Sequence, residues 1–467
     1  TSGSFTNGLD GDGHSLTLNY SDTTTIDGNS VFFNLNDLTS HGPVELGGTI
    51  QTAGNQSYLN TATLINATQI QADGGSFEGG LVGAGNDLTL NIANTITIAD
   101  GSGVNNLTSV GETILTGTIN TTGSQTYQSN VTIEGDVELN AVGDVSFSNE
   151  VSGNQNESTG EPDLIINTQA DTTFGGTVSD LATLTTDAGG STITSADITT
   201  TGNQTYNDEF VLNTSLTLTG GSASFTGGID GDGNDLTLNF TGNATLDGGS
   251  TTISGINNLT SLGGLALNGT IQTDGIQTFE GHGVLLGDTT LVGSAGVHNG
   301  THDGYEHNLT INYTSTTTIS SSGGNITNFT SVGDVLLNTT GFETIGSQTF
   351  QGTVTLTGDT MLTGTSGSFA SGLDGDNHSL TLNYFNTTTI DGNSVFNNLN
   401  DLTSHGPVEL GGTIQTAGNQ SYLGGATLIN ATEIQADGGS FEGGLVGAGN
   451  DLTLNIANTI TIEDGSG

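Results

Sequence analysis

Pairs of aspartates separated by one glycine are the residues of this chain whose type and spacing best suit a binding site. Carboxylates two residues apart resemble the start of a calcium-binding loop, because Ca²⁺ prefers oxygen ligands. Neither the twelve-residue loop with its terminal glutamate nor the GGxGxD nonapeptide follows them. Asp-Gly is also a common turn dipeptide, so two interpretations stay open, a calcium site and a simple turn. The six candidate ligands are Asp10, Asp12, Asp230, Asp232, Asp374 and Asp376.

A histidine-rich tract and one Gly-His-Gly tripeptide offer two further kinds of chemistry. His298, His302 and His307 lie in VHNGTHDGYEHN, whose imidazoles and carboxylates are ligand types for a transition metal. The tract occurs in one repeat only, where the other copies have a turn. Gly281–Gly283 is similar to a tripeptide of pectin-degrading β-helix enzymes, which also need clustered aspartates and a basic motif. This chain has no Lys or Arg, so we expect no enzyme and keep a polysaccharide hydrolase, which needs two carboxylates, as a remote alternative.

These candidates lie within an internal repeat, which decides the class of fold. Ser15–Gly28 reads SLTLNYSDTTTIDG, and related copies recur every 71–76 residues. Residues 1–103 return as residues 365–467 with about ten differences, an offset of 364 residues that spans five units. We therefore predict one continuous array over residues 1–467, an excerpt of a longer one. The first leucines of the copies are Leu16, Leu88, Leu164, Leu236, Leu309, Leu380 and Leu452.

Apolar residues alternate with polar ones within each unit, as Leu16, Thr17 and Leu18 do. The runs last four to six residues and end at Gly, Asn or Asp, which indicates strands and turns. No stretch has helical periodicity. Short strands in a long array predict an all-β fold, a parallel β-helix with three or four coils per unit of about 72 residues. At roughly 4.8 Å per coil, the chain would form a rod on the order of 100 Å long.

The charge of the chain excludes several functions. It has 48 Asp and Glu residues, a formal charge of −48 and no cysteine. Nucleic-acid binding needs cationic side chains, and disulfides need cysteine. No apolar run approaches the length of a membrane span, which is roughly 18 residues or more. No cofactor is required, but we expect calcium or other divalent cations from solution to relieve repulsion between carboxylates.

A glutamine two residues before an aromatic residue marks a fixed station of each unit. We expect the aromatic ring to fill a corner of the coil, and carbohydrate stacking is the alternative. The copies are Gln56–Tyr58, Gln125–Tyr127, Gln204–Tyr206, Gln277–Phe279, Gln348–Phe350 and Gln420–Tyr422.

One segment, residues 149–163, interrupts the regular repeat. It is polar and contains Pro162, so we expect a loop that protrudes from the coil.

The run from Thr172 to Phe210, TTFGGTVSDLATLTTDAGGSTITSADITTTGNQTYNDEF, resembles repeats of filamentous-haemagglutinin-like exoproteins. The resemblance covers the whole chain in repeat style and carries no catalytic motif. It implies a right-handed parallel β-helix, export to the bacterial cell surface, and a role as a fibre, stalk or adhesin. Expected partners are further copies or the continuation of the array, and host surfaces, neighbouring cells or glycans.

The main alternative is a module that binds glycans or another surface. An ice-binding threonine array is one form of it, but we expect the threonine runs to recur only once per unit.

Overall fold

The computed structural model describes residues 1–154 and 160–466. These residues form a parallel β-solenoid of about 23 turns, with 63 strands and no helix. The fold class predicted from the repeats and the alternation is therefore confirmed. Thr25 and Glu45, which lie opposite each other on successive turns, are 20 residues apart in the chain. The repeat interval of the sequence is three to four times that step, so each unit holds three to four turns, as expected.

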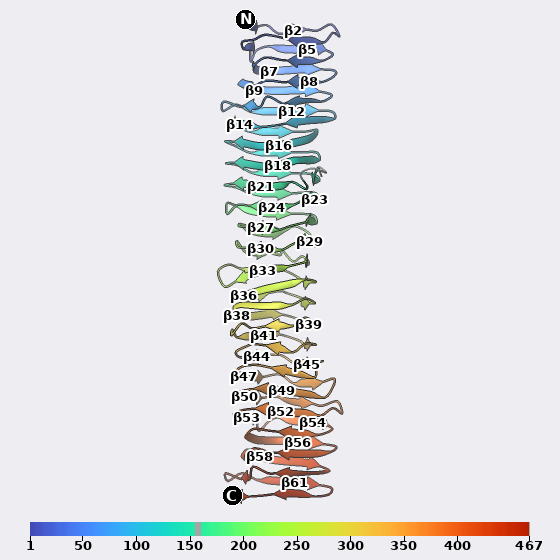
Figure 1. The fold of residues 1–467 in the computed structure, drawn as a ribbon, viewed down its shortest axis with the longest axis vertical. Helices are drawn as coiled ribbons and strands as arrows, with labels where there is room; N and C mark the ends of the chain where they lie inside the picture. The colour runs from blue at the N-terminus through green and yellow to red at the C-terminus, as the bar shows by residue number, and fades with distance from the viewer. Residues whose placement is uncertain (155–159, 467) are drawn as a thin grey trace. The chain divides into compact units, whose positions relative to one another are not determined.

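The chain divides into two compact units. Unit 1 comprises residues 1–234 and 239–241, and unit 2 comprises residues 235–238 and 242–467. Each unit is a stack of short parallel strands (Figure 1). That the array is one continuous body stays a prediction.

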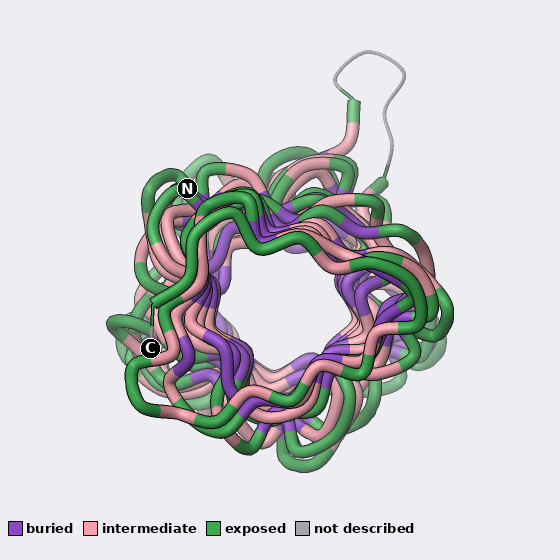
Figure 2. The backbone as a smooth tube through the Cα atoms, turned by 90° about the horizontal axis from the view of Figure 1, so that it is seen from below, coloured by how far each residue is buried: buried purple, intermediate pink, exposed green. Residues whose placement is uncertain are grey.

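In unit 1, strand β12 (Leu88–Ile92) shows how a coil is held. It pairs in parallel with β9 (Ala62–Ala72) on one side and β15 (Leu107–Ser109) on the other. Leu88 and Leu90 are fully buried, whereas the residues between them face outward. Because parallel register places equivalent residues above one another, the inward side chains of successive coils stack into a continuous core. Figure 2 shows this alternation of buried and exposed residues around the coils.

In unit 2 the same arrangement recurs, with one group of strands forming a separate sheet. Strand β41 (Leu309–Tyr313) pairs with β38 (Gly283–Gly293) and β44 (Phe329–Ser331). The seven strands of the separate sheet are β46 (Gly341–Glu343), β49 (Thr360–Gly364), β52 (Leu380–Tyr384), β55 (Leu402–Ser404), β57 (Asn419–Tyr422), β59 (Gly438–Phe441) and β62 (Ile460–Ile462).

The long-range repetition of the sequence is also structural. In unit 1, β7 (Val44–Thr52) pairs with β9 so that Val44 lies opposite Ala62. In unit 2, β56 (Val408–Thr416) pairs with β58 (Ala426–Ala436) in the same register. The repeated sequence therefore folds in the same way in both places.

The segment predicted as a loop, residues 149–163, begins within the coil. Its start contains β20 (Val151–Gly153), which pairs with β18 (Val131–Ala141) and β23 (Val178–Leu181). Val151 is fully buried, so this apolar residue continues the core. Residues 155–159 lie outside the described residues.

Candidate functional site

In each predicted calcium site the first aspartate ends a short strand and the second lies in the turn that follows, before a strand of the LTLN type. In each pair the first carboxylate accepts a hydrogen bond from the backbone N–H of the second aspartate, which fixes a tight turn. The Oδ1–N distance is 3.1 Å for Asp10 and Asp12, for Asp230 and Asp232, and for Asp374 and Asp376.

The same turn forms where the carboxylates are missing. Ala84 replaces Asp12 in the next copy, and their φ angles are 47° and 49°. The backbone N–H of Asn86 donates to Gly83 O at 2.9 Å, as His14 N–H does to Gly11 O at 2.8 Å. This favours the turn interpretation, and calcium binding stays a prediction. Among the described residues, no three His, Cys, Asp or Glu side chains are grouped so that they could hold a metal ion.

Many other carboxylates connect one coil to the next. Asp37 Oδ1 accepts the backbone N–H of Asn55 at 2.9 Å, and Asp288 Oδ1 accepts that of Asn308 at 2.9 Å. These backbone hydrogen bonds are the main reason why the pKa of each carboxyl lies below its usual value. Sequence analysis missed this role, which gives part of the negative charge a structural purpose.

The glutamines of the Gln-X-aromatic steps form buried hydrogen-bond centres, which we call the glutamine nodes. At Gln56, Nε2 donates to Ile50 O at 3.0 Å and to Gln71 O at 3.1 Å. Its Oε1 accepts the hydroxyl of Tyr58 at 2.7 Å. Each glutamine side chain thereby ties backbone segments of its own and the following coil together. The six nodes are Gln56, Gln125, Gln204, Gln277, Gln348 and Gln420, all at most 1% exposed.

Two nodes take their hydroxyl from a different place in the chain. Phe279 and Phe350 have no hydroxyl where the other copies have tyrosine. The hydroxyl of Tyr313 donates to Gln277 Oε1 at 2.8 Å, and that of Tyr384 donates to Gln348 at 2.7 Å. Each of these tyrosines follows its glutamine by 36 residues.

The aromatic rings of these steps point into the core. The Tyr58 ring is fully buried and stacks on Phe77, with ring centroids 4.9 Å apart. The predicted role in filling the coil is confirmed, and carbohydrate stacking on these rings is wrong because no ligand can reach them.

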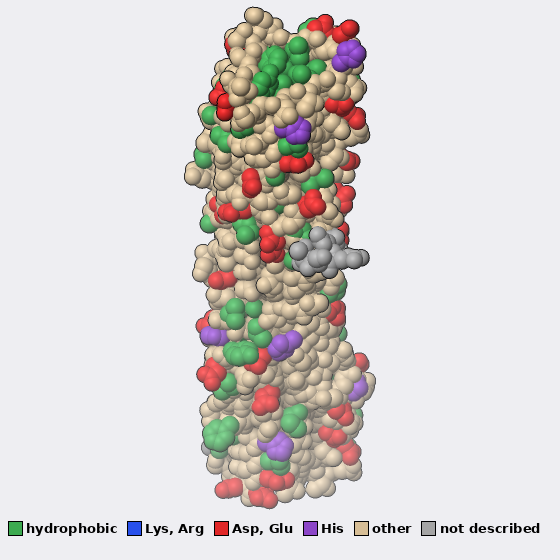
Figure 3. Space-filling view, turned by 45° about the horizontal axis from the view of Figure 1, so that its top comes forward, with side chains coloured by type: hydrophobic (Ala, Val, Ile, Leu, Met, Phe, Trp, Pro, Cys, Tyr) green, Lys and Arg blue, Asp and Glu red, His purple; other side chains and the backbone are tan. Residues whose placement is uncertain are grey.

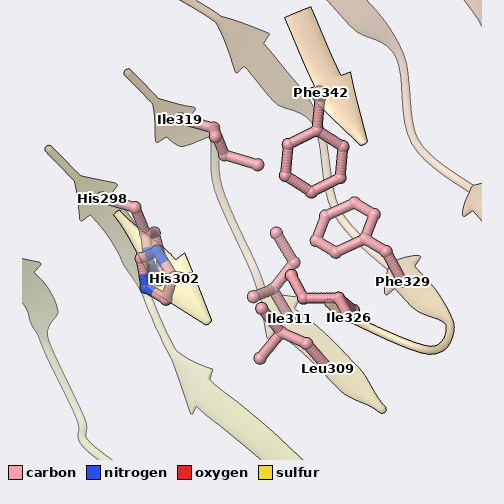
Figure 4. A pocket seen from close by; sticks show the side chains of 8 residues that line it. All are labelled: His298, His302, Leu309, Ile311, Ile319, Ile326, Phe329 and Phe342. Atoms are coloured by element: carbon pink, nitrogen blue, oxygen red, sulfur yellow. Dashed lines mark hydrogen bonds between the residues drawn. The ribbon is translucent and has the colours of Figure 1, made fainter. Parts of the chain in front are cut away.

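The three histidines of the histidine-rich tract do not come together. His298 and His302 are buried side by side, with His298 Nδ1 3.1 Å from His302 Nε2. His307 lies elsewhere, with its Nδ1 3.9 Å from Asp288 Oδ1. A small cavity of about 10 Å³ adjoins the buried pair (Figure 4). His282 of the Gly-His-Gly tripeptide is exposed and hydrogen-bonds through Nδ1 to Thr301 Oγ1 at 2.7 Å.

A row of hydroxyl side chains runs along seven successive coils of unit 2, which we call the threonine row. Its members lie opposite one another in parallel register and face outward, about 4.8 Å apart from coil to coil. Within the described residues only the hydroxyl of Thr389 in this row has a hydrogen bond, to Glu409 Oε2 at 3.0 Å. Threonine runs recur once per unit, as expected, but single hydroxyl residues from strands of different sequence form this row. The members are Thr270, Thr290, Thr310, Thr330, Thr349, Ser368 and Thr389.

Carboxylates are scattered over the visible face of the molecule (Figure 3). They do not gather into one acidic patch there, in agreement with their even distribution over the repeats.

The chain matches no protein-family model, no curated protein and no solved structure. The resemblance to filamentous-haemagglutinin-like repeats therefore stays a prediction. In the part of the chain that the structure describes, no helix has the length and apolar character needed to cross a membrane.

Proposed function

We propose that this chain is a structural segment of a giant extracellular fibre or adhesin on a bacterial surface. Its solenoid turns would space, display or assemble other parts of that protein. The observation that carries the proposal is the pairing of β7 with β9, which recurs between β56 and β58 in the second copy of the repeated block. A sequence block that folds identically at two places is a module that extends an array by addition.

The surface chemistry supports the same role. With no Lys or Arg against 48 acidic residues, a high net charge keeps such arrays soluble and prevents non-specific association. Continuation of the array or self-association is then controlled by cations, which relieve the repulsion between carboxylates.

Immunogold electron microscopy of intact cells of the source bacterium tests this proposal. Antibodies against the purified full chain should label filaments outside the cell envelope, and permeabilisation should not increase the label. Label that appears only after permeabilisation would contradict an extracellular role.

A second candidate is binding of a neutral glycan, and the threonine row favours it. Six of its seven hydroxyls have no hydrogen bond within the described residues, so they are available to the hydroxyls of a sugar chain. Thr310→Val with Thr330→Val removes two adjacent hydroxyls and preserves shape. Binding on a glycan array should fall for this variant and persist for Thr314→Val, a threonine outside the row. A thermal-hysteresis assay on the same proteins separates ice binding from glycan binding.

A further inference from the structure

The fourth and fifth copies of the glutamine node share one scheme but differ at two buried positions. Tyr313 hydrogen-bonds to Gln277 in the fourth copy, as Tyr384 does to Gln348 in the fifth. Equivalent residues of the two copies therefore differ in residue number by the same amount as Tyr313 and Tyr384. By this numbering, two buried histidines of the fourth copy stand where the fifth copy has two buried apolar residues. His298 is equivalent to Phe369, and His302 is equivalent to Leu373.

Other copies also carry apolar residues at these stations. Phe77 and Leu81 occupy them in one copy, and Phe225 and Ile229 in another, and all four are buried. The solenoid therefore does not need polar side chains here, and the histidine pair adds a property that the other copies lack.

The two imidazoles form a closed pair inside unit 2. His298 extends from β39 (Ala295–His298) and His302 from β40 (His302–Asp303), and they are 3% and 6% exposed. One ring donates and the other accepts the 3.1 Å hydrogen bond, and the remaining ring nitrogens face the Tyr313 hydroxyl and the backbone at Gly300. Figure 4 shows the two rings side by side, with Phe329 and Phe342 across the cavity.

The residue opposite His302 also differs from the residue opposite its counterpart. Gly323 lies opposite His302, whereas Phe396 lies opposite Leu373 in the fifth copy. The ring of Phe342 lies where a Cβ atom of Gly323 would be. A space of about 10 Å³, which is the space that one water molecule needs, remains beside the two histidines.

We propose that the His298–His302 pair is an acid-sensitive latch, in which proton uptake opens the turns around it while the turns around Phe369 and Leu373 stay closed. A charge on either ring would be buried without a counter-ion, which is strongly unfavourable. Local opening exposes the rings to water and relieves this penalty.

The surroundings of the pair compensate such a charge only in part, through a backbone hydrogen bond at Gly300 that favours the charged form of His302. Among the described residues, Tyr313 is the titratable side chain packed against His298, with its hydroxyl 3.5 Å from Nε2. His282 also acts on His302, and this interaction lowers the pKa of His302 further. The nearest carboxylates along the chain are exposed or half-exposed, on the outer side of the coils. They are Glu280, Asp288, Asp303 and Glu306.

The direction of the pH effect follows from burial. Burial lowers the pKa of His302 to about 4, and burial with the neighbouring His302 lowers the pKa of His298 well below its usual value. An exposed histidine has a pKa of about 6.5. The open state therefore binds protons first as pH falls. The stabilisation of the closed pair is complete above pH ~6.5 and is lost as pH falls towards about 4.

Hydrogen–deuterium exchange of the full chain at pH 7.5 and 4.5 tests the latch within one molecule. After correction for intrinsic rates, opening of β39 and β42 (Thr317–Ile319) should increase at least about a hundredfold at the lower pH, the effect of one ring alone. The counterparts β50 (Ser366–Phe369) and β53 (Thr388–Ile390) are the internal control, because they share the protonation of surface carboxylates. Equal changes in both regions would overturn the proposal.

Two variants give the latch a second test. His298→Phe with His302→Leu gives the fourth copy the residues of the fifth, so its acid-induced opening should fall to that of β50 and β53. Phe369→His with Leu373→His should introduce acid-induced opening there. Opening at β39 that persists in the first variant would assign the effect to other groups and contradict the latch.

Discussion

The glutamine nodes and the surface turns recur at the same interval, yet different features stay constant in them. At the nodes the hydrogen bond to glutamine Oε1 is kept while its donor changes, from Tyr58 in one copy to Tyr313 in another. At the turns the backbone is kept while the side chain changes, from Asp12 to Ala84. A buried polar atom without a partner costs about 1–3 kcal/mol, whereas an exposed one finds water. The comparison teaches that this solenoid conserves interactions inside and conformation outside.

Removing a node glutamine should have the largest effect. Gln56→Leu removes the hydrogen bonds to Ile50 O and Gln71 O and leaves the Tyr58 hydroxyl unpaired. We expect the free energy of unfolding to fall by about 3–5 kcal/mol. Urea denaturation followed by circular dichroism measures it. Gln69→Leu, at an outward position, should change it by less than about 0.5 kcal/mol, and similar losses in both variants would contradict the role of the node.

Substitution of a glycine in a surface turn should cause the second-largest loss of stability. A Cβ atom on Gly83 would overlap the Cα atom and the backbone nitrogen of Val104. Backbone atoms of the next coil cannot move away freely, so Gly83→Ala should lower the free energy of unfolding by about 2–3 kcal/mol. Gly85→Asn is the control, because Asn377 adopts a positive φ of 68° at the equivalent position. If the two variants were equally stable, close approach of the coils would not determine the turn.

Removing the hydroxyl that binds a node glutamine should lower the free energy of unfolding by an intermediate amount. Supplying a hydroxyl from another coil should restore it. Tyr58→Phe leaves Gln56 Oε1 unpaired and should lower the free energy of unfolding by about 1–2 kcal/mol. Adding Ile92→Tyr places a tyrosine where Tyr313 lies in the fourth copy. Gly75 lies opposite Gln56 as Gly296 lies opposite Gln277, so no side chain at that position competes with the added ring.

The double variant should therefore recover most of the loss in the same denaturation assay. Tyr305→Phe is the control, because Tyr305 is 62% exposed. A double variant less stable than Tyr58→Phe alone would show that the two positions do not exchange their donor.

How much of the fold and of the glutamine nodes could be predicted from the sequence depends on how far apart the interacting residues lie along the chain. Alternation such as Leu16, Thr17 and Leu18 is local, so it predicted strands, and the repeats predicted the solenoid. The partnership of Tyr313 with Gln277 spans 36 residues and depends on the number of residues per turn, which the sequence bounded only to three or four coils per unit. Aligning the copies would have revealed it, because a tyrosine appears at that same distance wherever glutamine is followed by Phe279 or Phe350.

The threonine row and the carboxylate hydrogen bonds were missed for a related reason. Thr310, Thr330 and Thr349 come from strands of different sequence, and only the register places them in one row. Asp37 meets the backbone of Asn55 because one coil separates them, which no local pattern indicates.

The smallest effect should be that of Asp12→Ala. Ala84 already adopts the same positive φ in the second copy, so loss of the carboxylate should change the free energy of unfolding by less than about 0.5 kcal/mol. Thermal unfolding of the wild type and this variant in chelator, in millimolar calcium and in sodium of matched ionic strength separates two causes. Diffuse screening of the charge of −48 should raise the midpoint similarly in both salts and in both proteins. A calcium-specific rise present in the wild type and lost in Asp12→Ala would instead establish a calcium site at the Asp-Gly-Asp turn. The surface turns would then conserve a ligand as well as a conformation, and the contrast with the glutamine nodes would be smaller than the structure indicates.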